Sequence, residues 1–435
     1  MTFKSSNGAV PLGEPIDQVM LVCTQVKNNH NKFWEGKLFK NGVYARWGRV
    51  DSTTTEDFWP DRGGPYFNAQ MRDKMGRSKE PYVKVSIAGS VATSKAIQQA
   101  GFAETAKRDI GHGGNKDVLR LLEDLAAINA HEIFSISGGS LKIGASGAVE
   151  TGVGIVAAHT IDEARPILKR IYTALARGHT AEDFIPDLEQ YLSLIPQKVG
   201  ARAGWHLTFL PDVEAAIQQA DFLDQLEASV PVAAVNVELP KEKQFNFEMA
   251  PLTDTAEIAR ITKYYESTKQ SRHPSSKLRI KRIFTVGFRD MAEDFETGKK
   301  VGNICELWHG TRTHNLLSLF SKNVLIPKQN DGIHINGRNF GNGFYMSDQS
   351  TKSANYSYGY WEGAQERRCF MLLVDAALGK QYVPLKDNEA RTWGRPPAGF
   401  DSVFAKPGFS GPIVNNEFIV YQTDRVNPKY LVEFE

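Results

Sequence analysis

The chain contains 435 residues, of which 41% are apolar and 23% charged, and its formal net charge is +2. These values exclude a disordered or fibrous protein, and the length predicts two to four domains. No run of 18 apolar residues is present and the N-terminus lacks the apolar core of a signal peptide. We therefore expect a soluble intracellular protein without membrane contact.

The cysteines and the charge distribution indicate which kinds of site and partner to expect. The three cysteines, Cys23, Cys305 and Cys369, lie far apart, which argues against a disulfide framework and against a structural zinc site, so we expect no metal. Lys and Arg outnumber Asp and Glu by 16 to 11 in residues 1–110, whereas the acidic residues lead by 16 to 9 in residues 111–235. A basic first segment permits contact with nucleic acid but does not require it.

The first part of the chain predicts a small antiparallel β domain. Residues 1–15 are rich in Gly, Pro, Ser and Asn and predict a flexible tail. Strand patterns follow in "VMLVCTQV", "FWEGKLF" and "VYARWGRV", and the last two are joined by an Asn41-Gly42 turn, which is typical of a hairpin. The segment "GPYFNAQMRDKMGRS" predicts a short helix, and "YVKVSIAG" a closing strand. We expect this domain to span residues 16–108.

The middle of the chain predicts an all-α helical bundle over residues 115–235. A glycine cluster, "GHGG", precedes it as a hinge. "DVLRLLEDLAAIN" has apolar residues at helical spacing. "TIDEARPILKRIYTALARG" predicts a helix that begins at a capping box of Thr160 and Glu163 and ends at Gly178. The charged residues fit solvated helix faces, and no catalytic group of residues is evident in this region.

Residues 236–435 mix short strands and helices and contain the residue types that chemistry needs. In "ELWHGT", His309 follows a short apolar strand, and Gly310 leaves room for a ligand near the backbone. Taken alone, a histidine in such a place is more often structural. In "FGNGFYMSD", Tyr345 is expected on a strand. "TKSANYSYGYW" carries aromatic residues that could stack on a flat ligand or fill a core.

A single carboxylate stands at the start of a late strand, in "NNEFIVY". Glu417 enters a run that alternates like a buried strand, and burying a charge there costs several kcal/mol unless it is paired or functional. A carboxylate can stabilise a developing oxocarbenium ion, as in glycoside cleavage. The alternative is an edge residue whose charge is satisfied by Asn415 or by a backbone amide.

The order of these three clusters along the chain is more specific than any of them alone. "LWHGTRTHNLLSLFSKNVLI", "FGNGFYMSDQSTKSANY", "LLVDAALGKQYV" and "NNEFIVYQTDRVNPKYLV" resemble, segment by segment, the catalytic domain of the poly(ADP-ribose) polymerase family. The resemblance implies an α+β multidomain protein that ends in a mixed antiparallel-β ADP-ribosyltransferase domain at residues 236–435. It also implies an enzyme that transfers ADP-ribose from NAD, its co-substrate, and releases nicotinamide.

The resemblance extends over about residues 16–435. "VYARWGRV" carries the signature of the Trp-Gly-Arg (WGR) domain, which implies that Trp47 and Arg49 contact DNA or relay its binding. A core position for Trp47 and a plain surface charge at Arg49 fit equally well. "DVLRLLEDLAAINA" and "DLEQYLSLIP" resemble the helical autoinhibitory domain of the family.

The resemblance also implies roles for single residues. His309 is expected to hold a hydroxyl of the adenosine ribose, and the Gly310 backbone and the Ser353 hydroxyl to bind the nicotinamide carboxamide. Tyr356 and Tyr345 are expected to sandwich the nicotinamide ring. The remaining two are Lys352, expected close to the nicotinamide ribose, and Glu417, expected to contact its 2′-hydroxyl and to orient the acceptor. The catalytic set is thus Glu417, His309 and Tyr345.

The leading hypothesis is a DNA-break-stimulated poly(ADP-ribose) polymerase. Its partners would be DNA strand breaks and acceptor proteins, itself included, and it would reside in the nucleus of a eukaryote or in the cytoplasm or nucleoid of a bacterium. Family members without the glutamate generally add single units, so Glu417 favours chain elongation. The alternatives are a mono-ADP-ribosyltransferase acting on protein or nucleic-acid ends, and a DNA-end binding scaffold with a vestigial NAD site. Retention of His309, Tyr345 and Glu417 argues against the scaffold.

Overall fold

The computed structural model divides the chain into two compact units. One comprises Met1–Phe102 and His131–Lys241, and the other Ala103–Ala130 and Glu242–Glu435. The structure describes residues 9–50, 52–85, 102–136, 141–143, 149–151, 154–155, 158–229, 245–322, 339–360, 366, 368–386, 393–411 and 413–435. Residues 1–8 of the predicted tail lie outside these ranges. The predicted domain boundaries stay a prediction.

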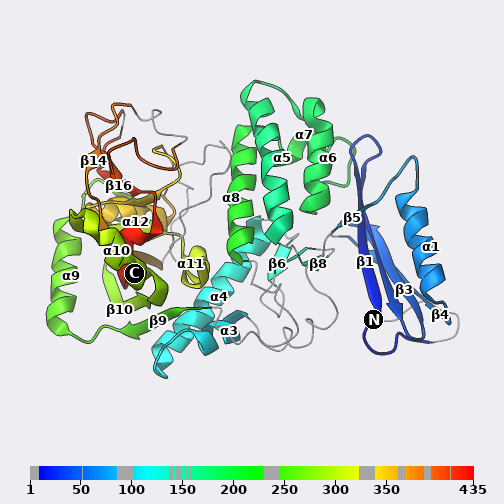
Figure 1. Cartoon of the computed structure of the whole chain (residues 1–435), viewed down its shortest axis with the longest axis horizontal. Helices are drawn as coiled ribbons and strands as arrows, with labels where there is room; N and C mark the ends of the chain where they lie inside the picture. Colours follow the sequence, from blue (N-terminus) through cyan, green and yellow to red (C-terminus); the bar gives the residue numbers. More distant parts are fainter. Residues whose placement is uncertain are drawn as a thin grey trace. The chain divides into compact units, whose positions relative to one another are not determined.

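A five-stranded antiparallel sheet forms part of the first unit (Figure 1). Its strand order is β4-β3-β2-β1-β5, and helix α1 packs on it through the buried Phe67. Phe39 pairs with Gly42 across a two-residue turn, so the predicted hairpin is confirmed. The elements are β1 (Asp17–Gln25), β2 (His30–Phe39), β3 (Gly42–Arg49), β4 (Thr54–Pro60), α1 (Gly64–Met75) and β5 (Val83–Val85).

The rest of the first unit is mainly helical. Helix α5 packs against α6 and α8. The capping box predicted at Thr160 is wrong, because α5 begins two residues earlier and Thr160 is buried inside it. Gly178 does follow the helix end, with φ +84°, a conformation that glycine adopts without strain. The helices are α5 (Ala158–Ala176), η1 (Ala181–Phe184), α6 (Ile185–Leu194), α7 (His206–Phe209) and α8 (Val213–Ser229).

The prediction of an all-α segment over residues 115–235 is wrong at one place. Three short strands, β6 (Leu141–Ile143), β7 (Val149–Thr151) and β8 (Gly154–Ile155), form a small antiparallel sheet between the helices. β-Branched residues such as Ile143, Val149 and Thr151 favour this pairing over a helix.

The second unit contains two sheets. The larger one is antiparallel with the order β11-β13-β17-β10-β9, and the smaller one has the order β12-β16-β15-β14, in which β14 and β15 are parallel. The α+β class with a mixed sheet is thereby confirmed. The strands are β9 (Phe247–Pro251), β10 (Ile280–Phe288), β11 (Ile304–Thr311), β12 (Phe344–Met346), β13 (Cys369–Ala377), β14 (Gln381–Tyr382), β15 (Ser402–Ala405), β16 (Glu417–Val420) and β17 (Val426–Phe434).

Helices border these two sheets. They are α3 (Phe102–Asp109), α4 (Lys116–Ile136, of which the part up to Ala130 belongs here), α9 (Thr255–Ser267), η2 (Pro274–Lys277), α10 (Arg289–Gly298), η3 (Lys299–Val301), η4 (Thr313–Asn315), α11 (Leu316–Lys322), α12 (Ser350–Tyr358) and η6 (Thr423–Arg425). Between α3 and α4, Gly111 of the predicted hinge exchanges backbone hydrogen bonds with β9 at Phe247 and Met249. No helix within the described ranges is both long and apolar enough to cross a bilayer.

Two backbone hydrogen bonds join the sheets of the second unit. The amide of Trp308 on β11 donates to the Ser347 carbonyl, and the amide of Ser347 donates to the Trp308 carbonyl, both at 2.9 Å. The indole of Trp308 is fully buried and stacks on Tyr264 of α9, with ring centres 5.5 Å apart. Because Ser347 directly follows β12, this bridge fixes the smaller sheet against β11.

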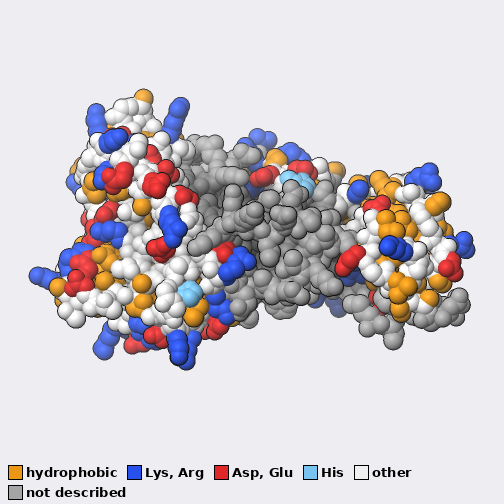
Figure 2. Space-filling model, turned by 60° about the horizontal axis from the view of Figure 1, so that its bottom comes forward, with side chains coloured by type: hydrophobic (Ala, Val, Ile, Leu, Met, Phe, Trp, Pro, Cys, Tyr) orange, Lys and Arg blue, Asp and Glu red, His pale blue; other side chains and the backbone are white. Residues whose placement is uncertain are grey.

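A buried carboxylate ties α4 to the larger sheet. Glu433 on β17 is fully buried and accepts hydrogen bonds from Arg282 at 2.7 Å and from Arg368 at 2.8 Å. Arg368 also donates to Asp124 of α4 at 2.7 Å. A buried carboxylate needs such partners because its desolvation is costly. Figure 2 shows Lys and Arg side chains interspersed with Asp and Glu over the visible described surface.

We expect Glu433→Gln to lower the free energy of unfolding by about 2 kcal/mol, because two guanidinium groups then face a neutral amide. Urea denaturation followed by tryptophan fluorescence measures this loss. The matched control is Glu296→Gln, which removes an exposed ion pair with Lys299 and should leave stability nearly unchanged. An equal effect of both substitutions would contradict a special role for Glu433.

Candidate active site

His309 occupies a half-buried position on β11, and its contacts fix its tautomer. Its ring stacks on Phe344 with centres 4.0 Å apart, and Nδ1 lies 2.7 Å from the Tyr345 carbonyl oxygen. A carbonyl can only accept, so Nδ1 carries the proton and Nε2 presents a lone pair. Burial lowers the pKa of His309 to about 4 despite the hydrogen bond to Tyr345, and the charge of Lys352 adds to the decrease. The ring is therefore neutral at pH 7 and offers Nε2 as an acceptor.

Gly310 and Ser353 set the distance between β11 and α12. A Cβ at position 310 would overlap the Ser353 carbonyl, so a larger residue would push the helix away from the strand. The Ser353 hydroxyl donates to the Trp308 carbonyl at 2.9 Å. Ser350 and Ser357, on the same side of α12, likewise donate to carbonyls of neighbouring elements. These buried serines hold α12 firmly on the sheet.

Lys352 and Glu417 form a buried ion pair. Lys352 Nζ lies 2.9 Å from Glu417 Oε1 and 5.0 Å from the centre of the Tyr356 ring. Both charged side chains are largely buried. Burial by itself disfavours the ammonium, but Glu417 and Tyr356 outweigh it and raise the pKa of Lys352. The site thus holds a fixed carboxylate beside a fixed positive charge.

The two residues before Glu417, Asn415 and Asn416, are both held by hydrogen bonds from distant side chains. Arg272 donates to the Val414 carbonyl and to Asn415 Oδ1, both at 2.9 Å. Asn416 Nδ2 donates to Asp348 at 2.9 Å, and the Ser347 hydroxyl donates to the Asn416 carbonyl at 2.8 Å. Glu417 then begins β16 by pairing with Ala405. The carboxylate is therefore mounted on a rigid strand start.

Sequence reasoning missed the two side chains that hold these asparagines, Arg272 and Asp348. Arg272 precedes Asn415 by 143 residues and Asp348 precedes Asn416 by 68 residues. Arg272 belongs to no quoted motif, and Asp348 ends "FGNGFYMSD" without any pattern that points to Asn416, so no local signal indicated these contacts.

Tyr345 lies on β12 and pairs with Ile419 of β16. The prediction that it lies on a strand is confirmed. Its hydroxyl donates to the Gly341 carbonyl at 2.8 Å and accepts from the Phe340 amide at 2.9 Å. Gly341 has φ +84°, a conformation that glycine adopts without strain, and it lets the chain turn between Phe340 and Tyr345. The Tyr345 hydroxyl thus holds the turn at Phe340 and Gly341, while its carbonyl contacts His309.

Contacts connect all the residues predicted for the NAD site. β11 carries His309 and Gly310, which meet Tyr345 and Ser353 respectively. α12 and β16 meet through Lys352 and Glu417. The structure therefore brings together His309, Gly310, Tyr345, Lys352, Ser353, Tyr356 and Glu417. Their roles in binding and catalysis stay predictions.

The two residues predicted to contact DNA belong to the first unit. Trp47 on β3 is half-buried and stacks on Trp59, with ring centres 6.5 Å apart and planes inclined by 14°. Arg49 donates to the backbone carbonyls of Asn29 at 2.8 Å and Gly200 at 2.7 Å. The guanidinium thus holds the loop at residue 200 onto the sheet, which fits a relay role better than a phosphate contact.

Comparison with known proteins gives a consistent result. Residues 255–408 match the family model of the poly(ADP-ribose) polymerase catalytic domain, a range that includes the residues predicted for the NAD site except Glu417. The chain is similar to the poly [ADP-ribose] polymerases of Sarcophaga peregrina (24% identity over 95% of this chain and 45% of that protein) and Drosophila melanogaster (23%, 96% and 46%). It is also similar to the human protein mono-ADP-ribosyltransferase PARP4 (26%, 64% and 16%). The chain spans less than half the length of these relatives.

We expect the His309 imidazole resonance to stay constant in NMR titrations from pH 8 to 5.5 and to move only toward pH 4. The folded-state pKa of about 4 lies below the ordinary value of 6.5. The neutral ring therefore contributes stability that is complete above pH 6.5 and is lost as the pH falls toward 4. Burial also lowers the pKa of His314 to about 4, so His314→Gln and His309→Gln are needed to assign the two signals. A midpoint near 6.5 for His309 would contradict the lowering of its pKa by burial.

Proposed function

Because the chain belongs to the poly(ADP-ribose) polymerase family and its catalytic-domain match marks it as an NAD ADP-ribosyltransferase, we propose that it is a DNA-break-stimulated poly(ADP-ribose) polymerase. It transfers ADP-ribose from NAD to proteins and to growing ADP-ribose chains. The observation that carries the proposal is the buried ion pair of Lys352 and Glu417. Lys352 lies on α12, and this helix contacts β11, the strand of His309, through the hydrogen bond from Ser353 to Trp308.

The proposed NAD site uses the groups that the geometry leaves in position. His309 Nε2 accepts a hydrogen bond from a hydroxyl of the adenosine ribose, which its neutral tautomer supports. The backbone of Gly310 and the hydroxyl of Ser353 meet the carboxamide of nicotinamide. Tyr356 and Tyr345 bound the nicotinamide ring from either side, which suits aromatic stacking. NAD supplies the glycosidic bond that is broken.

Glu417 acts at the ribose that becomes electron-deficient. When the glycosidic bond breaks, nicotinamide leaves with the electron pair and positive charge develops on the ribose. The fixed carboxylate stabilises this charge more than the neutral ground state, and burial strengthens the effect. Lys352 holds Oε1, so Oε2 is the atom that accepts the proton of the incoming acceptor hydroxyl as the new bond forms.

The proposed stimulation by DNA assigns residues 16–108 to a WGR domain and residues 115–235 to a helical regulatory domain. The half-buried Trp47 offers an aromatic edge to a DNA end, and Arg49 fastens the neighbouring loop to the same sheet. On the catalytic side, α4 is held by the ion pair between Asp124 and Arg368. DNA binding would favour local opening of the helices, which couples the two sites energetically.

A second candidate is a mono-ADP-ribosyltransferase. The similarity to a protein of that name favours it, although that match covers 64% of the chain, against 95% or more for the two insect poly [ADP-ribose] polymerases. Product length distinguishes the two candidates.

We expect Glu417→Gln to reduce chain elongation about a hundredfold or more while NAD affinity stays within about threefold, because the amide no longer stabilises positive charge or accepts a proton. Labelled NAD with gel analysis gives product length, and calorimetry gives NAD affinity. The matched control is Glu293→Gln on the exposed face of α10. Unchanged polymer length in Glu417→Gln would refute the role of Glu417.

We expect a nicked or blunt duplex to raise the transfer rate about 5- to 150-fold, the range of ordinary allosteric coupling. Trp47→Ala should lose this stimulation and keep the basal rate, whereas Trp47→Phe, which retains an aromatic plane, should restore part of it. Equal activity with and without DNA would reject the DNA part of the proposal. Absence of any transfer would reject the enzymatic part.

A further inference from the structure

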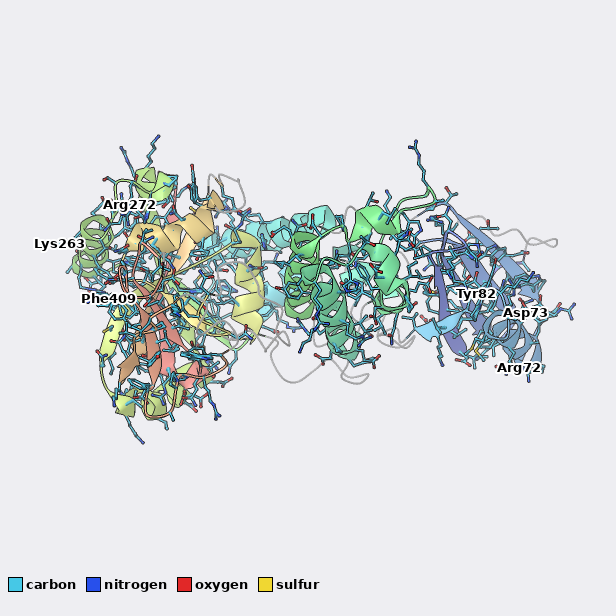
Figure 3. All side chains as sticks on the ribbon, turned by 90° about the horizontal axis from the view of Figure 1, so that it is seen from above. Arg72, Asp73, Tyr82, Lys263, Arg272 and Phe409 are labelled. Carbon is cyan, nitrogen blue, oxygen red and sulfur yellow. The ribbon has the colours of Figure 1, made fainter. Side chains whose placement is uncertain are left out.

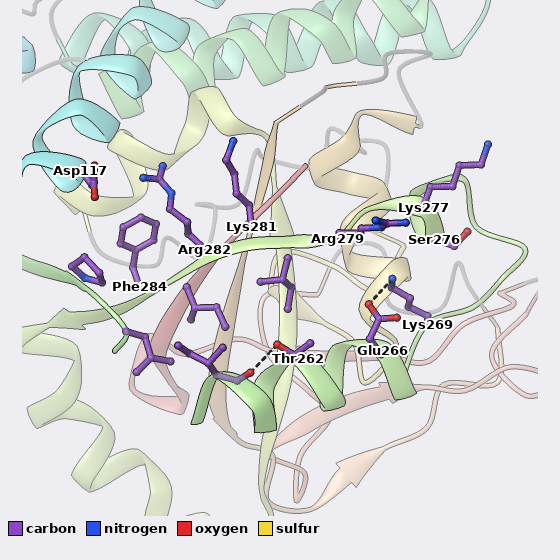
Figure 4. Close-up of a pocket in the computed structure, with 15 residues that line it drawn as sticks. Asp117, Thr262, Glu266, Lys269, Ser276, Lys277, Arg279, Lys281, Arg282 and Phe284 are labelled. Atoms are coloured by element: carbon purple, nitrogen blue, oxygen red, sulfur yellow. Dashed lines mark hydrogen bonds and ion pairs between the residues drawn. The ribbon is translucent and has the colours of Figure 1, made fainter. Parts of the chain in front are cut away.

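A groove of about 970 Å³ lies between α9, η2 and β10 of the second unit (Figure 4). One side of α9 forms a wall, with Ile258, Thr262 and Glu266 at helical spacing, and Lys269 lies just beyond the end of the helix. The floor beneath α9 is apolar at Ile283 of β10, which is buried in a cluster with Ile261 of α9. The groove therefore combines an apolar base with a polar rim, as ligand sites commonly do.

This groove is separate from the candidate NAD site. In the larger sheet, β13 and β17 lie between β11, which carries His309, and β10, which lines the groove. Three strand spacings of about 4.8 Å place the two strands about 14 Å apart. A nicotinamide ring held by α12 would not reach the groove.

Positive charge is concentrated along one edge of the groove. Residues 269–282, "KQSRHPSSKLRIKR", contain six basic residues and no acidic one. Figure 4 shows Lys277, Arg279 and Lys281 following one another along the edge, with α9 opposite them. Lys281 pairs with Glu435 at 3.2 Å, whereas the exposed side chains of Lys277 and Arg279 have no ion-pair partner within the described part of the chain. These two cations are available to an anionic ligand.

The same basic stretch passes close to Glu417. Its Arg272 holds Asn415, two residues before Glu417, and η2, which follows directly, contacts α12 through Ser275. Figure 3 shows Arg272 within the second unit. The basic stretch therefore runs continuously from Arg272, which holds the segment before Glu417, to the residues that line the groove.

We propose that this groove binds pyrophosphate-linked nucleotide units of an ADP-ribose chain, the polymer that the proposed function would produce. Each unit carries two negatively charged phosphates, which can form ion pairs with the neighbouring side chains of Lys277 and Arg279. Each unit also carries a flat adenine, which can pack on the apolar floor. A chain held there stays close to the transferase site while it grows. The inference rests on the proposed function for the origin of its ligand, but its binding step needs no catalysis.

The test measures binding of fluorescently labelled ADP-ribose oligomers of defined length to the full chain, without NAD, at about 0.1 M salt, where exposed charges still act over roughly 10 Å. We expect the double variant Lys277→Gln with Arg279→Gln to raise Kd about tenfold and to make the salt dependence of binding less steep. Lys263→Gln is the matched control, because Lys263 is an exposed lysine of α9 outside the groove (Figure 3). It should bind like the unaltered chain.

Two further ligands decide the chemistry of the site. Single ADP-ribose should bind more weakly than the oligomers but show the same loss in the double variant. Polyglutamate should bind more weakly than an oligomer of equal charge. An unchanged Kd in the double variant, or equal binding of polyglutamate, would overturn the proposal. Because no NAD is consumed, a negative result here is distinct from a failure of the transferase assay.

Discussion

The candidate site depends on the paired backbone hydrogen bonds between Trp308 and Ser347. They join the smaller sheet to β11 and so place β12, which carries Phe344 and Tyr345, beside His309. The buried indole of Trp308, stacked on Tyr264, gives this junction a rigid base. A slip of one residue at the junction would shift Phe344 and Tyr345 relative to His309, whose strand is held in register by β13. The chemistry of the site therefore rests on the register of one short bridge.

The second unit also contains buried charged side chains that form ion pairs with residues from distant segments of the chain. Lys352 and Glu417 neutralise each other, and Glu433 is shared by Arg282 and Arg368. Taking such groups out of water is costly, and each pair is stable only while the surrounding backbone keeps its geometry. The two networks thus make the positions of α12, β16 and β17 depend on one another through the sheets that carry them.

Local patterns in the sequence were sufficient for much of the fold. The hairpin at Asn41-Gly42 and the strand that begins at Glu417 each follow from short-range periodicity or turn chemistry. The family motifs also identified residues that the structure brings together. Local patterns failed where pairing is long-range or weakly encoded, as for Arg272 with Asn415, Arg49 with Gly200, and the short strands around Lys142. Ionic partners such as Glu433 and Arg368 have no periodic signature, so only the folded chain reveals them.

The position of α4 has an electrostatic consequence for the groove beside α9. Asp117, in the first turn of α4, lines that groove, so the docked helix contributes a negative charge to it. A polyanion in the groove and the docked α4 thus repel each other. By thermodynamic reciprocity, whatever releases the helix strengthens the hold on the polyanion, and the bound polyanion favours the released helix by the same free energy. Under the proposed function, this aspartate would make the growing product a ligand that favours release of α4.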